Sequence, residues 1–219
     1  KIEQFYQYYL LIKEWNSFMN LTAITEFDEV LEKHFLDSIK LMDYVSFNQV
    51  ENCKILDLGT GAGFPGIPLK IMMPDVTFVL MDSLNKRIKF LNEVISRLGL
   101  KKITAIHGRA EEMARNPEYR ENFDYVVSRA VANLSTLSEF CIPFVKKGGY
   151  FIPYKSGNVE GERIEASKAV ELLGGSIKET SYFQLGEDME RSFVFIEKKK
   201  ETPKKYPRAG GKPVKEPLK

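Results

Sequence analysis

Short β-branched runs alternate with longer amphipathic stretches from residue 52 onward, and this alternation leaves few topologies open to the chain. Strands separated by helical patterns of roughly 10–15 residues build βαβ crossovers and a mostly parallel sheet. The predicted strands are 54–57, 77–81, 103–107, 125–128, 150–154, 177–184 and 192–197. The predicted helices between them are 65–73, 84–98, 110–115, 133–145 and 158–173. We therefore expect a doubly wound α/β fold with seven strands.

The last two predicted strands are joined differently from the others. Only residues 185–191 connect them, which is too short for a crossover helix. This pair should form an antiparallel hairpin at the end of an otherwise parallel sheet.

The first 47 residues contain no Gly or Pro and have helical spacing. The spacing of Ile2, Phe5, Tyr6 and Tyr9 at i, i+3, i+4 and i+7 predicts a helix. A second helix is expected over 28–45, where Asp28 could cap its start. Its apolar face would contain Leu31, Phe35, Ile39 and Met42. Together these patterns predict one domain, 1–219. Its parts are a helical extension (1–51), a nucleotide-binding core (52–197) and a basic tail (198–219).

A glycine-rich turn follows the first predicted strand, where residues 55–66 read ILDLGTGAGFPG. It matches the dinucleotide fingerprint G-x-G-x-x-G, with Asp82 as the ribose partner. It also fits an S-adenosylmethionine loop, in which an acidic residue precedes the glycines. Asp57 would repel a pyrophosphate but could hold the methionine ammonium, and Pro65 removes an amide that a pyrophosphate would use. These features favour S-adenosylmethionine, bound at Asp57 and Gly61, over NAD and an oxidoreductase.

Further cofactor candidates come from the ends of other predicted strands, because ligands bind at the carboxyl edge of such sheets. Asp82 can accept both ribose hydroxyls, although Asp82 or Ser83 could instead cap the next helix. Ala110 and Glu111 could frame the adenine edge. Arg129 should lie at the mouth of the pocket, where it could pair with a carboxylate or a phosphate.

Charge is unevenly distributed along the chain. The whole sequence has 32 basic and 30 acidic residues, but the last 22 residues hold nine Lys/Arg and two Glu, which leaves the rest at net −5. This asymmetry indicates a polyanionic partner such as nucleic acid, or alternatively a solvated, disordered tail. The basic residues that could contact such a partner are Lys155, Lys204, Lys205, Arg208, Lys212 and Lys215.

Two cysteines in apolar stretches, Cys53 and Cys141, do not make a disulfide framework, so we expect a cytoplasmic protein. We find neither a metal-ligand pattern nor an apolar run of the roughly 18 residues that a membrane span requires. The expectation is therefore a protein without a metal and without a membrane partner, and we expect a monomer.

Five segments of the chain are distinctive when taken together: NLTAI (20–24), HFLDS (34–38), DLGTGAGFPGIPL (57–69), SRA (128–130) and YPRAGGKPVKEPL (206–218). With these segments the chain resembles one family, the bacterial small-subunit rRNA guanine-N7 methyltransferases. The resemblance covers essentially the whole chain. It implies the Rossmann-like fold of class I methyltransferases with an N-terminal helical extension, and it maps cofactor contacts onto Gly59, Phe64, Ala110, Glu111 and Arg129.

The resemblance also implies a reaction: methyl transfer from S-adenosylmethionine to N7 of one guanine in 16S rRNA, on the small ribosomal subunit or its precursor. Guanine N7 carries an in-plane lone pair, so we expect a proximity mechanism without an indispensable general base. Arg129 and His34 are only weak catalytic candidates. A non-enzymatic rRNA-binding or assembly protein on the same fold is the alternative.

Overall fold

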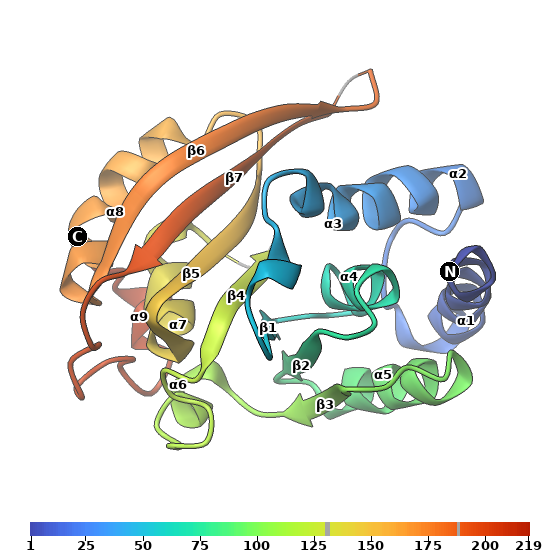
Figure 1. Ribbon diagram of the computed structural model, residues 1–219, viewed down its shortest axis with the longest axis horizontal. Coiled ribbons are helices and arrows are strands. Elements are labelled where there is room, and N and C mark those ends of the chain that lie inside the picture. Colours follow the sequence, from blue (N-terminus) through green and yellow to red (C-terminus); the bar gives the residue numbers. More distant parts are fainter. Residues whose placement is uncertain (130–131, 188) are drawn as a thin grey trace. The chain divides into compact units, whose positions relative to one another are not determined.

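The computed structural model describes residues 1–129, 132–187 and 189–219. The chain forms two compact units, Lys1–His107 and Gly108–Lys219. Figure 1 labels helices and strands of the chain. Seven strands follow the order β3-β2-β1-β4-β5-β7-β6 in one sheet. The predicted α/β fold with a seven-stranded, mostly parallel sheet is confirmed.

The first unit contains the N-terminal helices and three strands. Its helices are α1 (Ile2–Met19), α2 (Phe27–Val30), α3 (Asp37–Ile39), α4 (Gly66–Met72) and α5 (Asn85–Arg97). Its strands are β1 (Lys54–Leu58), β2 (Thr77–Asp82) and β3 (Ile103–His107). Strands β1 and β2 are parallel, as are β2 and β3. Their carboxyl ends therefore meet at one edge, where the glycine turn begins.

The helical extension differs from its prediction in detail. Helix α1 confirms the helix predicted at the start of the chain. It buries Tyr8, Tyr9, Leu11 and Ile12, whereas Ile2 is 89% exposed. The helix has apolar residues on more than one side, and only its packing against α4 and α5 selects the buried one. The second predicted helix is interrupted by a π-helical segment, Leu31–Leu36, and ends in a 3₁₀ segment, Lys40–Asp43. Its N-cap is Glu26, not Asp28.

The second unit contains the other four strands and the tail. Its strands are β4 (Phe123–Arg129), β5 (Val145–Ser156), β6 (Gly175–Leu185) and β7 (Met189–Lys198). Its helices are α6 (Ala110–Met113), α7 (Leu134–Cys141), α8 (Glu160–Leu172) and α9 (Lys212–Lys215). Strands β4 and β5 are parallel, while β7 pairs antiparallel with both β5 and β6. The predicted closing hairpin is confirmed.

The helix predicted over 133–145 is shorter than expected. Helix α7 ends at Cys141, a 3₁₀ segment covers Ile142–Phe144, and Val145 already belongs to β5. Pro143 has no amide to donate, so the α-helical hydrogen-bond pattern stops before it and the 3₁₀ segment takes over.

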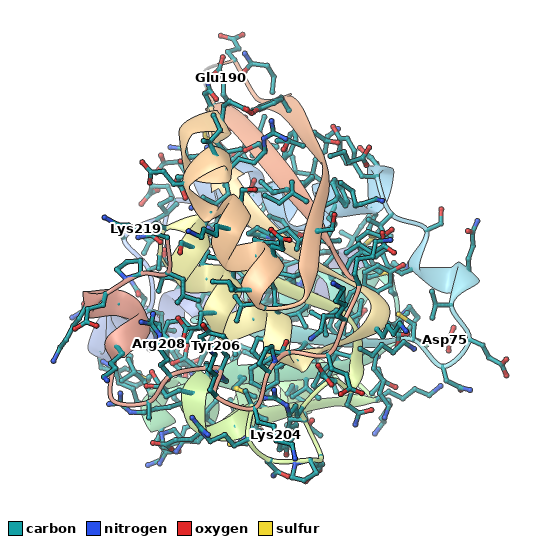
Figure 2. All side chains as sticks on the ribbon, turned by 90° about the vertical axis from the view of Figure 1, so that its left-hand side faces the viewer. Asp75, Glu190, Lys204, Tyr206, Arg208 and Lys219 are labelled. Atoms are coloured by element: carbon teal, nitrogen blue, oxygen red, sulfur yellow. The ribbon has the colours of Figure 1, made fainter. Side chains whose placement is uncertain are left out.

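The basic tail is packed within the second unit, so its interpretation as a disordered extension was wrong. Tyr206 is 6% exposed, and the Thr136 hydroxyl of α7 donates to the Pro213 carbonyl at 2.9 Å. Arg208 forms an ion pair with Glu139, a carboxylate of α7, at 2.7 Å. Figure 2 labels Tyr206 and Arg208 on the tail, together with Lys204 and Lys219. Side chains of the tail therefore form part of the core of this unit.

Lys198, the last residue of β7, is a buried cation with 1% of its surface exposed. Its ammonium donates to the Ile142 carbonyl at 2.8 Å and to the Thr202 hydroxyl at 2.7 Å, and it lies 3.0 Å from the Glu121 carboxylate. Burial lowers the pKa of Lys198 to about 8, although Glu121 acts in the opposite direction.

This pKa predicts a pH-dependent stability. The unfolded state holds the Lys198 proton up to a pH near 10.5, so protonated Lys198 opposes folding below pH 8 and the penalty disappears as the pH rises toward 10.5. Between about pH 7.5 and about pH 9.5, the wild type should gain on the order of 2 kcal/mol of unfolding free energy relative to Lys198→Met. Urea unfolding of the wild type and of Lys198→Met at the two pH values measures this difference. An equal pH response of both proteins would contradict the assignment.

Among the helices of the described residues, none is long and apolar enough to cross a bilayer.

Candidate functional site

The glycine turn of the first unit is braced by a carboxylate beneath it. Asp57, next to last in β1, is fully buried. Its Oδ2 accepts from the Thr60 hydroxyl at 2.7 Å and from the Gly66 amide at 2.8 Å. Gly61 and Gly63 have φ of +62° and +100°, a region that residues with a Cβ rarely adopt. The sequence predicted Asp57 and Gly61 as site residues, but the bracing contact with Thr60 was not foreseen.

Asp82, at the carboxyl end of β2, holds the other side of the turn. Its Oδ2 accepts from the Gly61 amide at 3.0 Å, and its Oδ1 accepts from the Leu84 amide at 2.9 Å. Arg87 of α5 lies 3.1 Å from Oδ2. Asp82 thus ties the glycine turn to the start of α5. The sequence indicated either a ligand or a cap here, and the expected ribose contact stays a prediction. Ser83 is exposed beside Asp82.

Aromatic side chains connect the N-terminal extension to the same turn. Phe64 is 6% exposed, and the His34 ring stacks on it with centroids 4.4 Å apart. The Thr22 hydroxyl lies 2.9 Å from His34 Nε2. Tyr8, fully buried in α1, donates a hydrogen bond to the Ala62 carbonyl within the turn. The structure brings the candidates His34 and Phe64 together, and it adds Tyr8, which helical periodicity alone could not assign to the site.

The remaining cofactor candidates belong to the second unit. Ala110 begins α6, and the Glu111 carboxylate of the same turn is largely buried. Glu111 lies 3.9 Å from the Arg109 guanidinium. Arg129 is the half-buried last residue of β4 and lies opposite Tyr154 of β5. Ala130, which completes the predicted Ser-Arg-Ala motif, lies outside the described residues.

The candidate RNA-binding cations fall into two groups. Lys155 pairs with Glu162 at 2.6 Å and is 12% exposed, and Arg208 is held by Glu139. Both charges are compensated within the chain. The other four candidates are exposed: Lys204, Lys205, Lys212 and Lys215.

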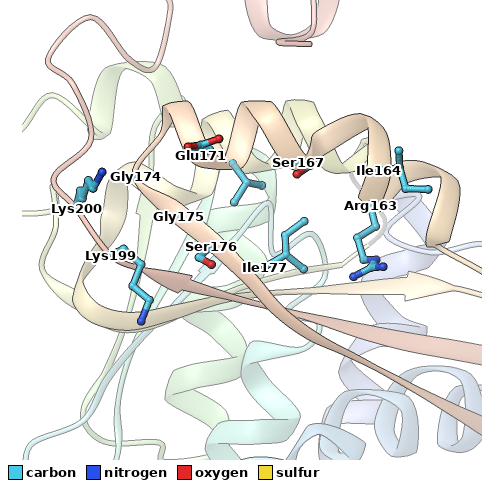
Figure 3. Close-up of a pocket in the computed structure, with 11 residues that line it drawn as sticks. Arg163, Ile164, Ser167, Glu171, Gly174, Gly175, Ser176, Ile177, Lys199 and Lys200 are labelled. Carbon is cyan, nitrogen blue, oxygen red and sulfur yellow. The ribbon is translucent and has the colours of Figure 1, made fainter.

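A cavity of about 690 Å³ lies beside α8 and the start of β6. Figure 3 shows Arg163 and Ile164 at one end of it and Lys199 and Lys200 at the other. None of the predicted cofactor or RNA-binding residues lines this cavity. Among the described residues, no group of three His, Cys, Asp or Glu is arranged to hold a metal ion.

The glycine turn has the features needed to hold a nucleoside cofactor. A Cβ built on Gly61 would meet only the Gly59 carbonyl, at 4.0 Å, so a ligand can approach the backbone closely there. The turn joins β1 to α4 at the carboxyl edge of β1, β2 and β3, where ligands of open α/β sheets bind. A seven-stranded sheet closed by an antiparallel hairpin, with a carboxylate-braced glycine turn after its first strand, defines a class I methyltransferase fold.

Comparison with solved structures supports this class of fold. Solved structures with the same fold include TrmN from Thermus thermophilus, with a TM-score of 0.56 and 17% identity over 74% of this chain and 48% of that one. A SAM-dependent methyltransferase from Aquifex aeolicus has a TM-score of 0.56 and 17% identity over 77% of this chain and 92% of that one. At such identities the likeness concerns the fold alone.

Sequence comparison identifies the family. The model of the family described as rRNA small subunit methyltransferase G matches residues 1–194. A relative of that name from Lachnoclostridium phytofermentans is 63% identical over 100% of this chain and 90% of its own length. Another from Clostridium novyi is 51% identical over 100% of this chain and 89% of its own length. The chain belongs to the rRNA small subunit methyltransferase G family.

Proposed function

We propose that this protein transfers the methyl group of S-adenosylmethionine to N7 of a guanine in 16S rRNA, as a cytoplasmic monomer. Membership of a family named for rRNA small-subunit methylation carries the proposal. The braced glycine turn supports it, because it offers an open backbone flanked by the carboxylates of Asp57 and Asp82.

The proposal assigns the cofactor contacts to the residues that the sequence predicted. When bound, S-adenosylmethionine supplies a methyl group on a positively charged sulfur. Gly59 and Gly61 would lie along it, Phe64 would contact it through its ring, and Asp82 with Ser83 would face the ribose. Ala110 and Glu111 would contact the adenine and Arg129 the carboxylate. Asp57 would act on the ammonium through water, since its carboxylate is buried under the turn.

The proposed chemistry requires alignment more than activation. Guanine N7 has a lone pair in the ring plane and loses no proton on methylation, so no side chain has to act as a general base. His34 fits a positioning role, because its ring stacks on Phe64 and its Nε2 lies beside the Thr22 hydroxyl. Tyr8 holds the turn through Ala62. The chain's contribution is to hold the turn rigidly.

The proposal is tested with small ribosomal subunits from cells that lack this gene. The purified protein and S-adenosylmethionine are added, and the 16S rRNA is digested and analysed by mass spectrometry. One new 7-methylguanosine is expected. Calorimetric binding of S-adenosylmethionine is measured in parallel. A protein that binds rRNA but neither binds the cofactor nor adds a methyl group would favour the non-enzymatic assembly role.

A further inference from the structure

Outside the tail the chain is net acidic, yet it contains one strongly basic segment. Residues 83–102, which contain α5, hold six Lys/Arg and a single Glu. Averaging over the whole chain hides this segment, because acidic residues dominate elsewhere. A local net charge of +5 over 20 residues attracts a polyanion.

The basic residues of α5 form an exposed strip, because its apolar residues Ile88, Phe90, Leu91 and Val94 are buried. Lys86 and Lys89 are exposed, and their spacing places them on neighbouring positions of the solvent side. Arg97 continues the strip about 17 Å along the axis from Lys86. Among the described residues, no carboxylate pairs with Lys86 or Lys89, while Arg97 lies 3.5 Å from Glu93. We call Lys86, Lys89 and Arg97 the α5 basic strip.

An aromatic ledge adjoins the strip. The ring of Trp15 in α1 packs against Phe90 of α5, with centroids 5.6 Å apart. Phe18 lies 5.4 Å from Trp15 and is 66% exposed. The Lys86 ammonium reaches the Met19 carbonyl at the end of α1, at 3.4 Å. An exposed ring and two lysines that pair with no carboxylate of the described residues therefore share one small surface of the first unit.

This surface begins close to the glycine turn. Arg87, next to Lys86 on α5, contacts the Asp82 carboxylate at 3.1 Å, and the same oxygen accepts from the Gly61 amide at 3.0 Å. A polyanion on the strip would thus lie near the proposed cofactor loop.

We propose that the α5 basic strip and the ledge formed by Trp15 and Phe18 bind a single-stranded stretch of the rRNA substrate. Phosphates contact Lys86 and Lys89, and one unstacked base lies on Phe18. The inference rests on the proposed function and names where the first unit holds the RNA. Cations beside a solvent-facing ring are the combination that binds single-stranded nucleic acid. A lipid surface does not fit, because the apolar face of α5 is buried in the protein core.

The lysines are tested by their salt dependence. The double variant Lys86→Gln/Lys89→Gln should weaken binding of labelled, protein-free 16S rRNA, and the slope of log K against log salt should become less negative by roughly 1.4, or about 0.7 per lost phosphate contact on a single strand. Lys168→Gln/Lys178→Gln is the matched control, because both lysines are exposed on the second unit and lie outside the basic tail. Calorimetric binding of S-adenosylmethionine by the Lys86/Lys89 variant should be unchanged, which separates lost contacts from lost folding.

The aromatic ledge is tested by Phe18→Ala. Loss of one stacked base should weaken rRNA binding by roughly five- to a hundredfold, with no change in salt slope because no charge is lost. Tyr182→Ala is the control, since Tyr182 of β6 is 52% exposed and lies outside the proposed surface. An equal loss of rRNA affinity in Tyr182→Ala would show that Phe18 makes no specific contact with the RNA.

The outcomes separate this inference from the proposed function. If the wild type methylates 16S rRNA while the Lys86/Lys89 variant keeps its affinity and salt slope, the surface is wrong and the function stands. If the variant loses affinity as expected but the wild type transfers no methyl group, the RNA surface stands and the proposed reaction is wrong. An equal loss in the Lys168/Lys178 control would also overturn the surface, because the effect would then be general electrostatics.

Discussion

Replacing Glu139 by Ala is expected to lower the free energy of unfolding by about 3 kcal/mol, because it leaves a largely buried guanidinium without its counter-ion. Glu139 lies on α7 with its side chain fully buried, and the partner, Arg208, is 23% exposed. The carboxylate accepts from Arg208 Nε at 2.9 Å, from Nη2 at 2.7 Å and from the backbone amide at 2.7 Å. Glu139 therefore holds the tail in two ways: through the ion pair with the Arg208 guanidinium and through the hydrogen bond from the Arg208 backbone amide.

Two comparisons make this prediction specific, with urea unfolding as the measurement. The exposed pair Glu160–Arg163 on α8 has similar contacts, yet Glu160→Ala should cause no measurable loss because water screens that pair. The double variant Glu139→Leu/Arg208→Leu should recover much of the stability, since no unpaired charge remains. A loss in Glu160→Ala as large as that in Glu139→Ala would show that burial is not the cause.

Gly66→Ala should impair both the fold and the proposed cofactor site. A Cβ at this position would lie 2.3 Å from Leu80 Cδ2 and 2.8 Å from Asp57 Oδ2. Overpacking of this kind lowers the free energy of unfolding by about 1–3 kcal/mol. Relief of the clash displaces the carboxylate that braces the turn, so we expect S-adenosylmethionine to bind at least roughly tenfold more weakly, the equivalent of one lost hydrogen bond to a charged group.

Gly161→Ala is the matched control for this substitution. Gly161 lies in the first turn of α8, and a Cβ there would meet no atom within 4 Å. The free energy of unfolding of Gly161→Ala should equal that of the wild type or exceed it by up to about 1 kcal/mol, because alanine restricts the unfolded chain and favours the helix. Calorimetric titration and urea unfolding of both variants provide the measurements. Wild-type affinity in Gly66→Ala would mean that the contact from Asp57 is not needed for binding.

The packed tail also changes how RNA binding should be tested. Deleting residues 200–219 would remove buried Thr202 and Tyr206 together with the partner of Glu139, so loss of activity would report unfolding of the second unit. Substitution of the exposed lysines is the sharper test. Lys204 and Lys212 are exposed. Their substitution leaves in place the contacts of α7 with Pro213 and Arg208 of the tail.

Much of the candidate site was predictable because it depends on local pattern. The order of strands and helices followed from periodicity, and the short link after β6 required the hairpin. The glycine turn was recognisable because its residues adjoin in sequence, and Asp57 and Asp82 followed from the ends of two predicted strands. Resemblance to a family added the reaction and the RNA substrate, which no periodicity contains.

Only the tertiary structure decided which distant groups meet. Tyr8 contacts Ala62 across 54 positions, and Arg208 meets Glu139 across 69. A hydropathy pattern records which side chains avoid water, but the partner of each buried polar group is settled by long-range packing. The same limit explains why the sequence left a solvated, disordered tail open as an alternative. Its nine cations are visible in the sequence, while the carboxylates that neutralise some of them are separated from it along the chain and adjacent only after folding.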